Sequence, residues 1–468
     1  MTDTNKRYDV IIIGAGPAGI FTALELIKNK DISVLIIDKG KDIDERKCPM
    51  RIGNNRCSQC LPCSLLSGWG GAGTFSDGKL NLSSEIGGQL ENYVKKEKVT
   101  EMIQYVDDIY LHFGASKTIF GLNIEEIEII KKEASLANLK LIPTKIRHLG
   151  TEKCVDILRK MYQYLRNKIT IKMNTEVKRL MVEEGRVVGI ETNKGEILKG
   201  DYIVASPGRV GAEWLKDQAN TLKIKISNNP VDLGVRVEVP AIVMKRLTDV
   251  IYESKLIYYT QKFDDRVRTF CMCPYGEVVT EFNDGITSVN GHSYHKHQTE
   301  NTNFAILVST HFTEPFKEPI AYGKYIAQLA NLLSGGVIIQ RLGDLELGRR
   351  STLDRIKQST VVPTLQKATP GDLSFVLPYR VLSDILEMIK AMDKIVPGVY
   401  SKYTLLYGVE VKFYSSRLEV SDVLETKIMN LFAAGDGAGI TRGIIQASVS
   451  GIVVAREILK RYMKSGNS

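Results

Sequence analysis

The chain has 468 residues, a length that predicts two or three domains. Its composition, 43% hydrophobic and 25% charged residues, is typical of a globular protein. No stretch approaches the ~18 apolar residues of a membrane helix, and the first apolar strand begins almost at the N-terminus, so we expect a cytoplasmic protein without membrane contact. The net charge of +9 comes from scattered basic residues, which makes nucleic-acid binding a weak expectation and fits an anionic cofactor, with an anionic small-molecule substrate as a further option.

The first predicted elements form a strand–turn–helix unit. An apolar strand at 10–13 leads into the motif Gly14-x-Gly16-x-x-Gly19 and an amphipathic helix, and a second apolar strand ends at Asp38, 19 residues after Gly19. This order is a dinucleotide-binding fingerprint. Gly14 permits the tight turn, Gly16 lets the backbone approach a pyrophosphate, and Gly19 lets the helix pack closely on the strand. The helix N-terminus attracts the phosphates, and the Asp38 carboxylate would accept hydrogen bonds from ribose hydroxyls.

The polar loop after Asp38 carries four of the seven cysteines, Cys48, Cys57, Cys60 and Cys63, with the spacing C-x8-C-x2-C-x2-C. In a cytosolic chain such a cluster indicates metal or redox chemistry rather than disulfides. The two C-x2-C steps and the proline after Cys48 resemble a ferredoxin cluster loop and predict a [4Fe–4S] cluster. Tetrahedral zinc, a set of redox-sensing thiols and unliganded cysteines are the alternatives.

Residues 68–80 form a second glycine-rich stretch without helical or strand periodicity, and we predict a loop whose backbone passes close to a ligand. Helices are predicted at 88–113, 123–137 and 151–168, followed by a meander of strands at 169–173, 177–182, 186–192 and 196–198, and an apolar strand that ends at Ala205. Alternating strands and polar loops from about 212 to 395 predict a mixed-sheet substrate domain, with strands at 234–239, 268–273 and 303–309 and helices near 318–334 and 380–394. The final segment repeats the opening pattern, with a strand at 430–434, a glycine-rich turn at 435–439 and a helix from about 443 to 464.

The fingerprint, the second glycine-rich loop, the meander and the final segment together resemble the FAD-binding domain of the glutathione-reductase-like superfamily, in its succinate-dehydrogenase-like branch. More narrowly, the chain resembles the uncharacterised FAD-dependent dehydrogenase family in the stretches Gly70–Lys79, Phe270–Pro274, Tyr407–Glu410 and Gly435–Gly439. The fold expected is α/β, with a Rossmann-type FAD-binding domain built from discontinuous segments and an α+β substrate domain. The expected boundaries are 1–80, 148–211 and 396–468 for the FAD-binding domain, 81–147 for a helical insertion and 212–395 for the substrate domain.

The resemblance implies a role for each part of the FAD site. The fingerprint glycines would face the pyrophosphate, Asp38 the adenosine ribose, the Val177 backbone the adenine, and Asp436 the ribityl chain. The segment Gly70 to Lys79 would line the pyrophosphate and the flavin ring, and the helix starting near Arg442 would point its dipole at the flavin N1/O2 edge. The predicted FAD-binding residues are Gly14, Gly16, Pro17, Ala18, Gly19, Asp38, Lys39, Gly70, Gly71, Ser76, Asp77, Gly78, Lys79, Val177, Ala205, Gly208, Gly435, Asp436, Arg442, Gly443 and Ile444.

The activity that the resemblance implies is that of an FAD-dependent oxidoreductase, moving a hydride or two electrons between flavin and a small organic substrate. The glycine-rich loop lacks the C-x4-C pair of disulfide reductases, and the chain has no second nucleotide fingerprint. NAD(P)H would therefore visit only transiently, and a ferredoxin-like electron carrier is the other option. A flavin-bearing RNA-modifying or RNA-binding protein and a flavin/cysteine redox sensor are the alternative functions.

Catalytic residues do not stand out in the substrate domain. His292 and Cys273 are candidates, although loop histidines are usually solvated and small buried residues usually structural. Cys271 and Cys273 would share one face of a strand, because side chains two residues apart point the same way. Arg236, Arg349 and Arg350 could bind an anionic substrate or could form ordinary ion pairs.

Overall fold

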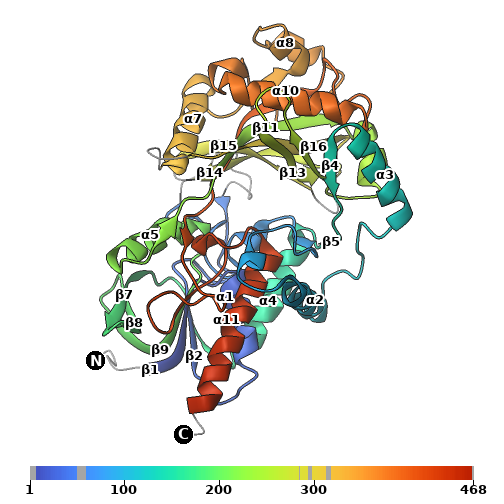
Figure 1. Cartoon of the computed structure of the whole chain (residues 1–468). Coiled ribbons are helices and arrows are strands. Elements are labelled where there is room, and N and C mark those ends of the chain that lie inside the picture. The colour runs from blue at the N-terminus through green and yellow to red at the C-terminus, as the bar shows by residue number, and fades with distance from the viewer. Residues whose placement is uncertain (1–6, 50–59, 284, 294–297, 313–317, 466–468) are drawn as a thin grey trace. The chain divides into compact units, whose positions relative to one another are not determined.

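The computed structural model describes residues 7–49, 60–283, 285–293, 298–312 and 318–465. The chain divides into two compact units (Figure 1). Unit 1 consists of residues 1–117, 147–229 and 414–468, and unit 2 of residues 118–146 and 230–413. Among the described residues, no helix combines the length and apolar character needed to cross a membrane.

Unit 1 is a Rossmann-type α/β domain assembled from three stretches of chain. Its helices are α1 (Pro17–Leu26), α2 (Lys96–His112), α4 (Thr151–Leu165), α5 (Ala212–Thr221) and α11 (Ile444–Ser465), with 3₁₀ turns at Gly71–Phe75, Leu90–Asn92, Arg209–Gly211 and Asp436–Ala438. Its strands are β1 (Arg7–Ile13), β2 (Val34–Ile37), β3 (Lys79–Asn81), β6 (Thr170–Lys172), β7 (Val177–Glu183), β8 (Arg186–Thr192), β9 (Ile197–Ala205), β10 (Ile226–Ser227), β20 (Arg417–Leu418) and β21 (Leu431–Ala433), and β5 (Ile146–His148) spans the boundary between the units.

The main sheet of unit 1 has the order β6-β2-β1-β9-β8-β7, and β21 also pairs with β9. Strands β6, β2, β1, β9 and β21 run parallel, whereas β7 and β8 form an antiparallel meander on β9. The apolar residues of β1 and β2 are buried on both faces, as parallel strands covered by helices require. The carboxyl ends of β1, β2, β9 and β21 therefore lie along one edge of the sheet, where ligands bind in open α/β folds.

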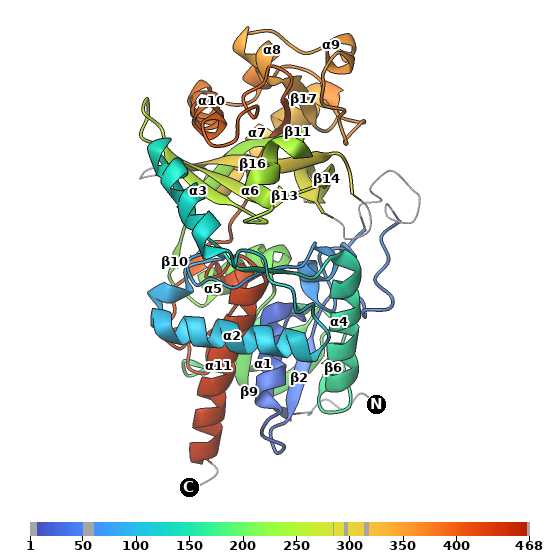
Figure 2. The same ribbon diagram turned by 90° about the vertical axis from the view of Figure 1, so that its right-hand side faces the viewer.

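Helices α1 and α11 lie side by side on this sheet, although they come from opposite ends of the sequence (Figures 1 and 2). A Cβ atom on Gly451 would stand 2.2 Å from the Ala18 carbonyl oxygen, so only glycine allows this approach of the two backbones. The Thr22 hydroxyl donates to the Gly451 carbonyl at 3.2 Å. The contact joins the fingerprint helix α1 directly to α11, the helix that follows the glycine-rich turn at 435–439.

Unit 2 contains an eight-stranded sheet of order β18-β17-β19-β11-β16-β13-β12-β4 and a separate β14–β15 hairpin. Its strands are β4 (Leu139–Ile142), β11 (Val231–Pro240), β12 (Lys255–Tyr259), β13 (Arg266–Cys273), β14 (Glu277–Asn283), β15 (Ile286–His292), β16 (Asn301–Thr310), β17 (Ile338–Arg341), β18 (Thr369–Pro370) and β19 (Leu405–Lys412). Its helices are α3 (Ile124–Leu136), α6 (Ala241–Thr248), α7 (Pro319–Ser334), α8 (Leu342–Glu346), α9 (Leu353–Lys357) and α10 (Tyr379–Asp393), with a 3₁₀ turn at Leu373–Phe375.

The central strand β11 shows how the two faces of this sheet differ. Its odd-numbered residues, such as Val235 and Val237, are fully buried in the apolar core that α10 and α7 cover. Its even-numbered residues include Asp232, Arg236 and Glu238, which are almost fully buried on the other face. One face of the sheet therefore forms the hydrophobic core, and the other carries a row of buried charged groups.

The predicted α/β fold with a Rossmann-type domain of discontinuous segments and an α+β second domain is confirmed, but the boundaries differ. The predicted insertion at 81–147 is not a unit of its own, because α2 packs against α11 whereas β4 pairs with β12 at the edge of the second sheet. The boundary expected near residue 396 lies at 414, since β19 pairs with β11 and β17 inside unit 2.

Two local predictions are also corrected. Strand β6 is predicted as the first strand of the meander, but it pairs in parallel with β2. Its partner in the sheet is therefore not its neighbour in the sequence. The second glycine-rich stretch is not entirely a loop, since residues Gly71–Phe75 form a short 3₁₀ helix.

A buried acidic pair in unit 2 makes its stability depend on pH. Asp384, fully buried in α10, lies near the Asp265 carboxylate. Burial, with a smaller contribution from Asp265, raises the pKa of Asp384 from 3.8 to about 7. Since the unfolded carboxyl loses its proton near pH 3.8 and the folded one near pH 7, the folded state is favoured at low pH and loses stability as the pH rises between these values.

We expect Asp384→Asn, which is neutral at every pH, to remove this loss. The melting temperature of the variant should exceed that of the wild type at pH 8, and the difference should shrink as the pH falls towards 4. Asp422→Asn, at an exposed position in unit 1, is the matched control and should leave the pH profile unchanged. A variant that melts below the wild type at pH 8 would contradict the assignment.

Candidate nucleotide-binding site

Two of the three fingerprint glycines are required by the packing of the protein itself. Gly14 has a φ of +103°, and a Cβ atom there would stand 2.1 Å from the Ser206 carbonyl oxygen. A Cβ atom on Gly19 would stand 2.0 Å from the Gly14 carbonyl oxygen, where α1 meets the end of β1. These positions confirm the tight turn and the close helix–strand contact that the sequence predicts.

Gly16 differs, because no atom of the described structure lies within 4 Å of the position that its Cβ would occupy. Its backbone is extended (φ −81°, ψ −175°), a conformation open to any residue, and it precedes α1 with no side-chain cap on the helix. The N–H groups of the first turn of α1 are therefore available, with the positive end of the helix dipole behind them. Nothing in the protein requires a glycine here, so the open space fits a pyrophosphate.

The Asp38 carboxylate joins the loops around this space. Its Oδ2 accepts from the Ala15 N–H at 2.9 Å, and its Oδ1 from the N–H groups of Gly40 at 2.7 Å and Gly68 at 2.9 Å. A carboxylate has about four acceptor positions, so room for one further donor is left. Asp38 thus orders the fingerprint turn, and its predicted contact with a ribose hydroxyl is compatible with these bonds.

The adenine end of the predicted site lies beside Asp38. The Thr175 N–H donates to the Asp38 carbonyl at 2.9 Å, and Val177 follows as the first residue of β7. Lys39 approaches Glu176 with 3.9 Å between the charged atoms. The structure thus brings Val177 and Lys39 to the same edge as the fingerprint, and their contacts with the cofactor stay predictions.

The second glycine-rich stretch lies directly on the first. The Gly70 N–H donates to the Ala15 carbonyl at 2.7 Å, and a Cβ atom on Gly71 would lie 3.1 Å from the Gly16 Cα. Trp69 fixes this stretch to α4, since its fully buried indole N–H donates to the Leu158 carbonyl at 2.9 Å. Two segments that are about fifty residues apart in the sequence therefore build one backbone cradle.

Arg46 holds the cradle together, and the sequence analysis missed it. Its buried guanidinium makes five hydrogen bonds, to the carbonyls of Ser64, Leu65, Trp69 and Gly71 and to the Thr74 hydroxyl. Burial lowers the pKa of Arg46 to about 10, while the nearby Asp38 charge opposes this effect. Its position in a polar loop without periodicity carries no sequence signal that would distinguish it from a solvated arginine.

The end of this stretch is also ordered. The Ser76 hydroxyl donates to the Gly73 carbonyl at 3.0 Å and accepts from the Gly78 N–H at 3.2 Å. Lys79 and Asp77 form a mostly buried ion pair with 2.9 Å between Nζ and Oδ2. These four predicted residues therefore form a turn with a polar, partly neutralised surface.

The third part of the cradle comes from the turns after β9 and β21. A Cβ atom on Gly437 would stand 2.5 Å from the Gly208 carbonyl oxygen, so the two turns pack backbone against backbone. The Gly435 N–H donates to the Ser450 hydroxyl at 3.0 Å, and a Cβ on Gly435 would touch the Ala18 side chain at 3.1 Å. Ala205, the last residue of β9, is buried beneath them.

Asp436 anchors the start of α11. Its Oδ1 accepts from the Thr441 hydroxyl at 2.7 Å and from the Gly443 N–H at 3.2 Å. Burial raises the pKa of Asp436, and these hydrogen bonds together with the Arg209 and Arg442 charges oppose the shift. Gly443 has a φ of +137°, and in the described part of the chain no contact lies within 4 Å of its Cβ position, which leaves the helix start at Ile444 open to a ligand.

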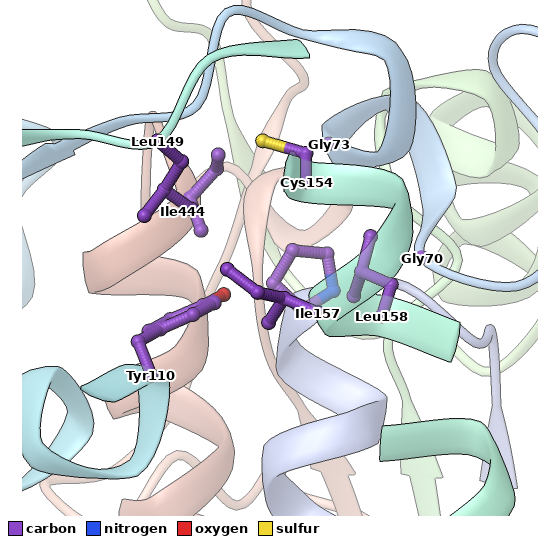
Figure 3. A pocket seen from close by; sticks show the side chains of 9 residues that line it. Gly70, Gly73, Tyr110, Leu149, Cys154, Ile157, Leu158 and Ile444 are labelled. Carbon is purple, nitrogen blue, oxygen red and sulfur yellow. The ribbon is translucent and has the colours of Figure 1, made fainter. Parts of the chain in front are cut away.

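A small apolar pocket lies between α1, α4 and α11 (Figure 3). Pro17, Gly70, Gly73, Tyr110, Leu149, Cys154, Ile157, Leu158 and Ile444 line it. Its volume of about 10 Å³ is near the lower limit for a single water molecule, which is far too small for a flavin ring. Burial raises the pKa of the Cys154 thiol and keeps it protonated.

The four-cysteine loop is only partly described. Cys48, Cys60 and Cys63 are half-buried thiols, and Cys57 lies outside the described residues. Arg46 fixes the following residues, Ser64 and Leu65, next to the cradle. The iron–sulfur cluster stays a prediction.

The structure places the candidate residues of the substrate domain in unit 2. Arg236 is fully buried and paired with Glu410, and Arg349 donates to Asp344 at 2.9 Å, so neither presents a simple anion site. Arg350 is exposed, and His292 is half-buried at the end of β15. Cys273 is fully buried.

Comparison with known proteins gives a family match for most of unit 2. Residues 231–413 match the family described as FAD-dependent protein, C-terminal domain-like, which confirms the resemblance to FAD-dependent proteins. An uncharacterised protein of Clostridium beijerinckii is 26% identical over 97% of this chain and 81% of its own length. Among solved structures, L-proline dehydrogenase from P. horikoshii (TM-score 0.43, 14% identity, 98% of this chain and 94% of that one) and formate oxidase from Aspergillus oryzae (TM-score 0.44, 12% identity, 99% and 100%) are similar. These structural similarities are too weak to indicate an activity.

Proposed function

We propose that this chain is an FAD-dependent oxidoreductase that moves a hydride or two electrons between flavin and a small organic substrate, and the match of residues 231–413 to a family of FAD-dependent proteins supports this. The observation that supports it most is the open position at Gly16, in front of the uncapped N-terminus of α1. Bound FAD would supply the redox chemistry, and the residues of unit 1 would bind and orient it.

The cradle favours FAD over FMN. The first glycine turn, Asp38 and the start of β7 serve the adenosine half of a dinucleotide, which FMN lacks. The second glycine-rich stretch, Asp436 and the start of α11 would hold the flavin half. A helix N-terminus near the flavin favours negative charge on it, as the anionic reduced form requires.

The substrate is proposed only by class. A small organic molecule, with an anionic group as one option, fits the net charge of +9. A transiently bound NAD(P)H or a ferredoxin-like carrier would supply or remove the electrons, since the chain has a single nucleotide fingerprint. A cytoplasmic location is part of the same proposal.

Analysis of the flavin and of its reduction tests the proposal. All of the flavin released from the purified protein should be FAD, and chromatography should detect no FMN. Its flavin absorbance should bleach under anaerobic conditions on addition of one member of a panel of small organic acids, amines and alcohols, and should return with an electron acceptor. Release of FMN alone would contradict the assignment of FAD as the cofactor. If the protein holds FAD, but neither NAD(P)H nor any compound in the panel is turned over, the result would favour a redox sensor.

A further inference from the structure

Two cysteines of unit 2 lie at an irregularity of β13. Cys271 and Cys273 flank Met272, whose side chain is buried in the apolar core. In a regular strand, the Cα atoms of residues i and i+2 are roughly 6.6–6.8 Å apart, the upper limit for a disulfide. Strand β13 is bulged between Phe270 and Cys273, and Cys271 has a φ of +45°. The two sulfur atoms lie 4.0 Å apart as a result.

Positive φ at a residue other than glycine is uncommon and costs stability unless the surroundings impose it. Here the Arg236 guanidinium imposes it, since Nη2 donates to the Cys271 carbonyl and also to the Cys273 sulfur at 3.4 Å. Arg236 itself is fixed by Asn303 at 2.8 Å and by Glu410 at 3.2 Å. The bulge is therefore held in place by a buried cation. Bulges of this kind are over-represented next to active sites.

Within unit 2, the buried charged groups beside the sulfur atoms have a surplus of positive charge. Glu410 is shared between Arg236 and Lys412, whose Nζ lies 3.0 Å from its Oε1, so the three groups together carry a net charge of +1. Such a cation beside a cysteine stabilises its anionic form. Asn303 pairs directly with Cys273 across the sheet, and among the described residues its buried Nδ2 has no hydrogen-bond partner. A donor is therefore left for a negative charge at this position.

We propose that Cys271 and Cys273 form a reversible dithiol–disulfide pair that exchanges electrons with low-molecular-weight disulfides and thiols. Cys271 is half-buried and Cys273 is fully buried, which assigns the first attack to Cys271. The proposal is independent of the flavin function.

The chemistry is a two-step thiol–disulfide exchange. The Cys271 thiolate attacks one sulfur of an external disulfide, the external S–S bond breaks, and one small thiol leaves with a proton. The Cys273 thiolate, stabilised by Arg236, then attacks the Cys271 sulfur, forms the intramolecular disulfide and releases the second small thiol. Two protein thiols are oxidised by two electrons, and one small disulfide is reduced to two thiols.

Mass spectrometry of a single peptide tests the pair. Cleavage after Arg268 and Lys296 releases residues 269–296, which contain both cysteines and none of the other five. The reduced native protein is incubated with glutathione disulfide, quenched with acid and then alkylated in denaturant, so that the buried Cys273 is accessible to the reagent. We expect the wild-type peptide to lose both alkylation sites together and to carry an internal disulfide, and added glutathione to restore both.

Single variants separate the two roles. Cys273→Ser should accumulate one glutathione on Cys271, because the resolving thiol is gone, whereas Cys271→Ser should remain alkylatable at Cys273 without an adduct. Cys154→Ser, at a buried position in unit 1, is the control and should behave as the wild type. Thermal melting of every protein confirms that exchange occurs in the folded state. Full alkylation of both cysteines in the wild type, or equal adducts in the two single variants, would overturn the proposal.

Discussion

Gly16→Val is expected to weaken FAD binding strongly while leaving the protein folded. The Cβ position of Gly16 faces open space and its φ of −81° suits any residue, so the protein tolerates the side chain. The methyl groups would occupy the place of the pyrophosphate, and overpacking of this kind costs about 1–3 kcal/mol. The affinity for FAD should fall about 10- to 100-fold, about 1.4–2.8 kcal/mol, as measured by titration of the apoprotein.

Gly19→Val is the contrasting variant, because its Cβ would stand 2.0 Å from the Gly14 carbonyl oxygen. This change should lower the melting temperature of the apoprotein itself, which Gly16→Val should not. Gly16→Ala, with one methyl group, should weaken FAD binding less. Wild-type flavin content in Gly16→Val, or unfolding of that variant, would contradict the assignment of Gly16 to the pyrophosphate.

Arg46→Met should cause a large loss of stability, because this side chain joins the parts of the cradle. The change removes the donors of five hydrogen bonds, so the five acceptor oxygens lose a partner. Arg46 is almost entirely buried, so water does not easily take its place. Each unsatisfied buried group costs about 1–3 kcal/mol before relaxation and water entry. We therefore expect urea denaturation to show a loss of about 3–5 kcal/mol in the free energy of unfolding.

Arg159→Met is the matched control. This arginine forms ion pairs with Asp44 and Asp156 on the surface, and its removal should cost less than about 1 kcal/mol. Arg46→Lys keeps the charge but has three donors in place of the five of a planar guanidinium, so its stability should lie between the wild type and Arg46→Met. Equal stability of Arg46→Met and Arg159→Met would show that water replaces the lost hydrogen bonds.

The sequence predicted those features that depend on neighbouring residues. The strand at 10–13, the glycine turn and the acid at Asp38 follow one another within thirty residues, and each has a local reason. Which sheet a strand joins depends on partners far away in the sequence. The sequence therefore predicts that residues 405–412 belong to the nucleotide-binding domain, whereas in the structure they form β19, which pairs with β11 in unit 2.

The same distinction explains which site residues were found. The cradle glycines stand out because their motif spacing is regular, whereas Arg46 acts through carbonyls that only the folded loop brings together. The charge cluster of Arg236, Glu410 and Lys412 was missed for this reason too. Its members come from strands β11 and β19, which are adjacent in the sheet and about 170 residues apart in the sequence.

The contact between α1 and α11 joins one of the first elements that the ribosome makes to the last one. Strand β1 and helix α1 are synthesised first, but β21 and α11, which complete the sheet and cover α1, are encoded after residue 430. The strands of unit 2 are all translated before then. The strands of unit 2 can therefore pair before unit 1 is complete, and the face of α1 that α11 covers stays without its partner until the end of synthesis.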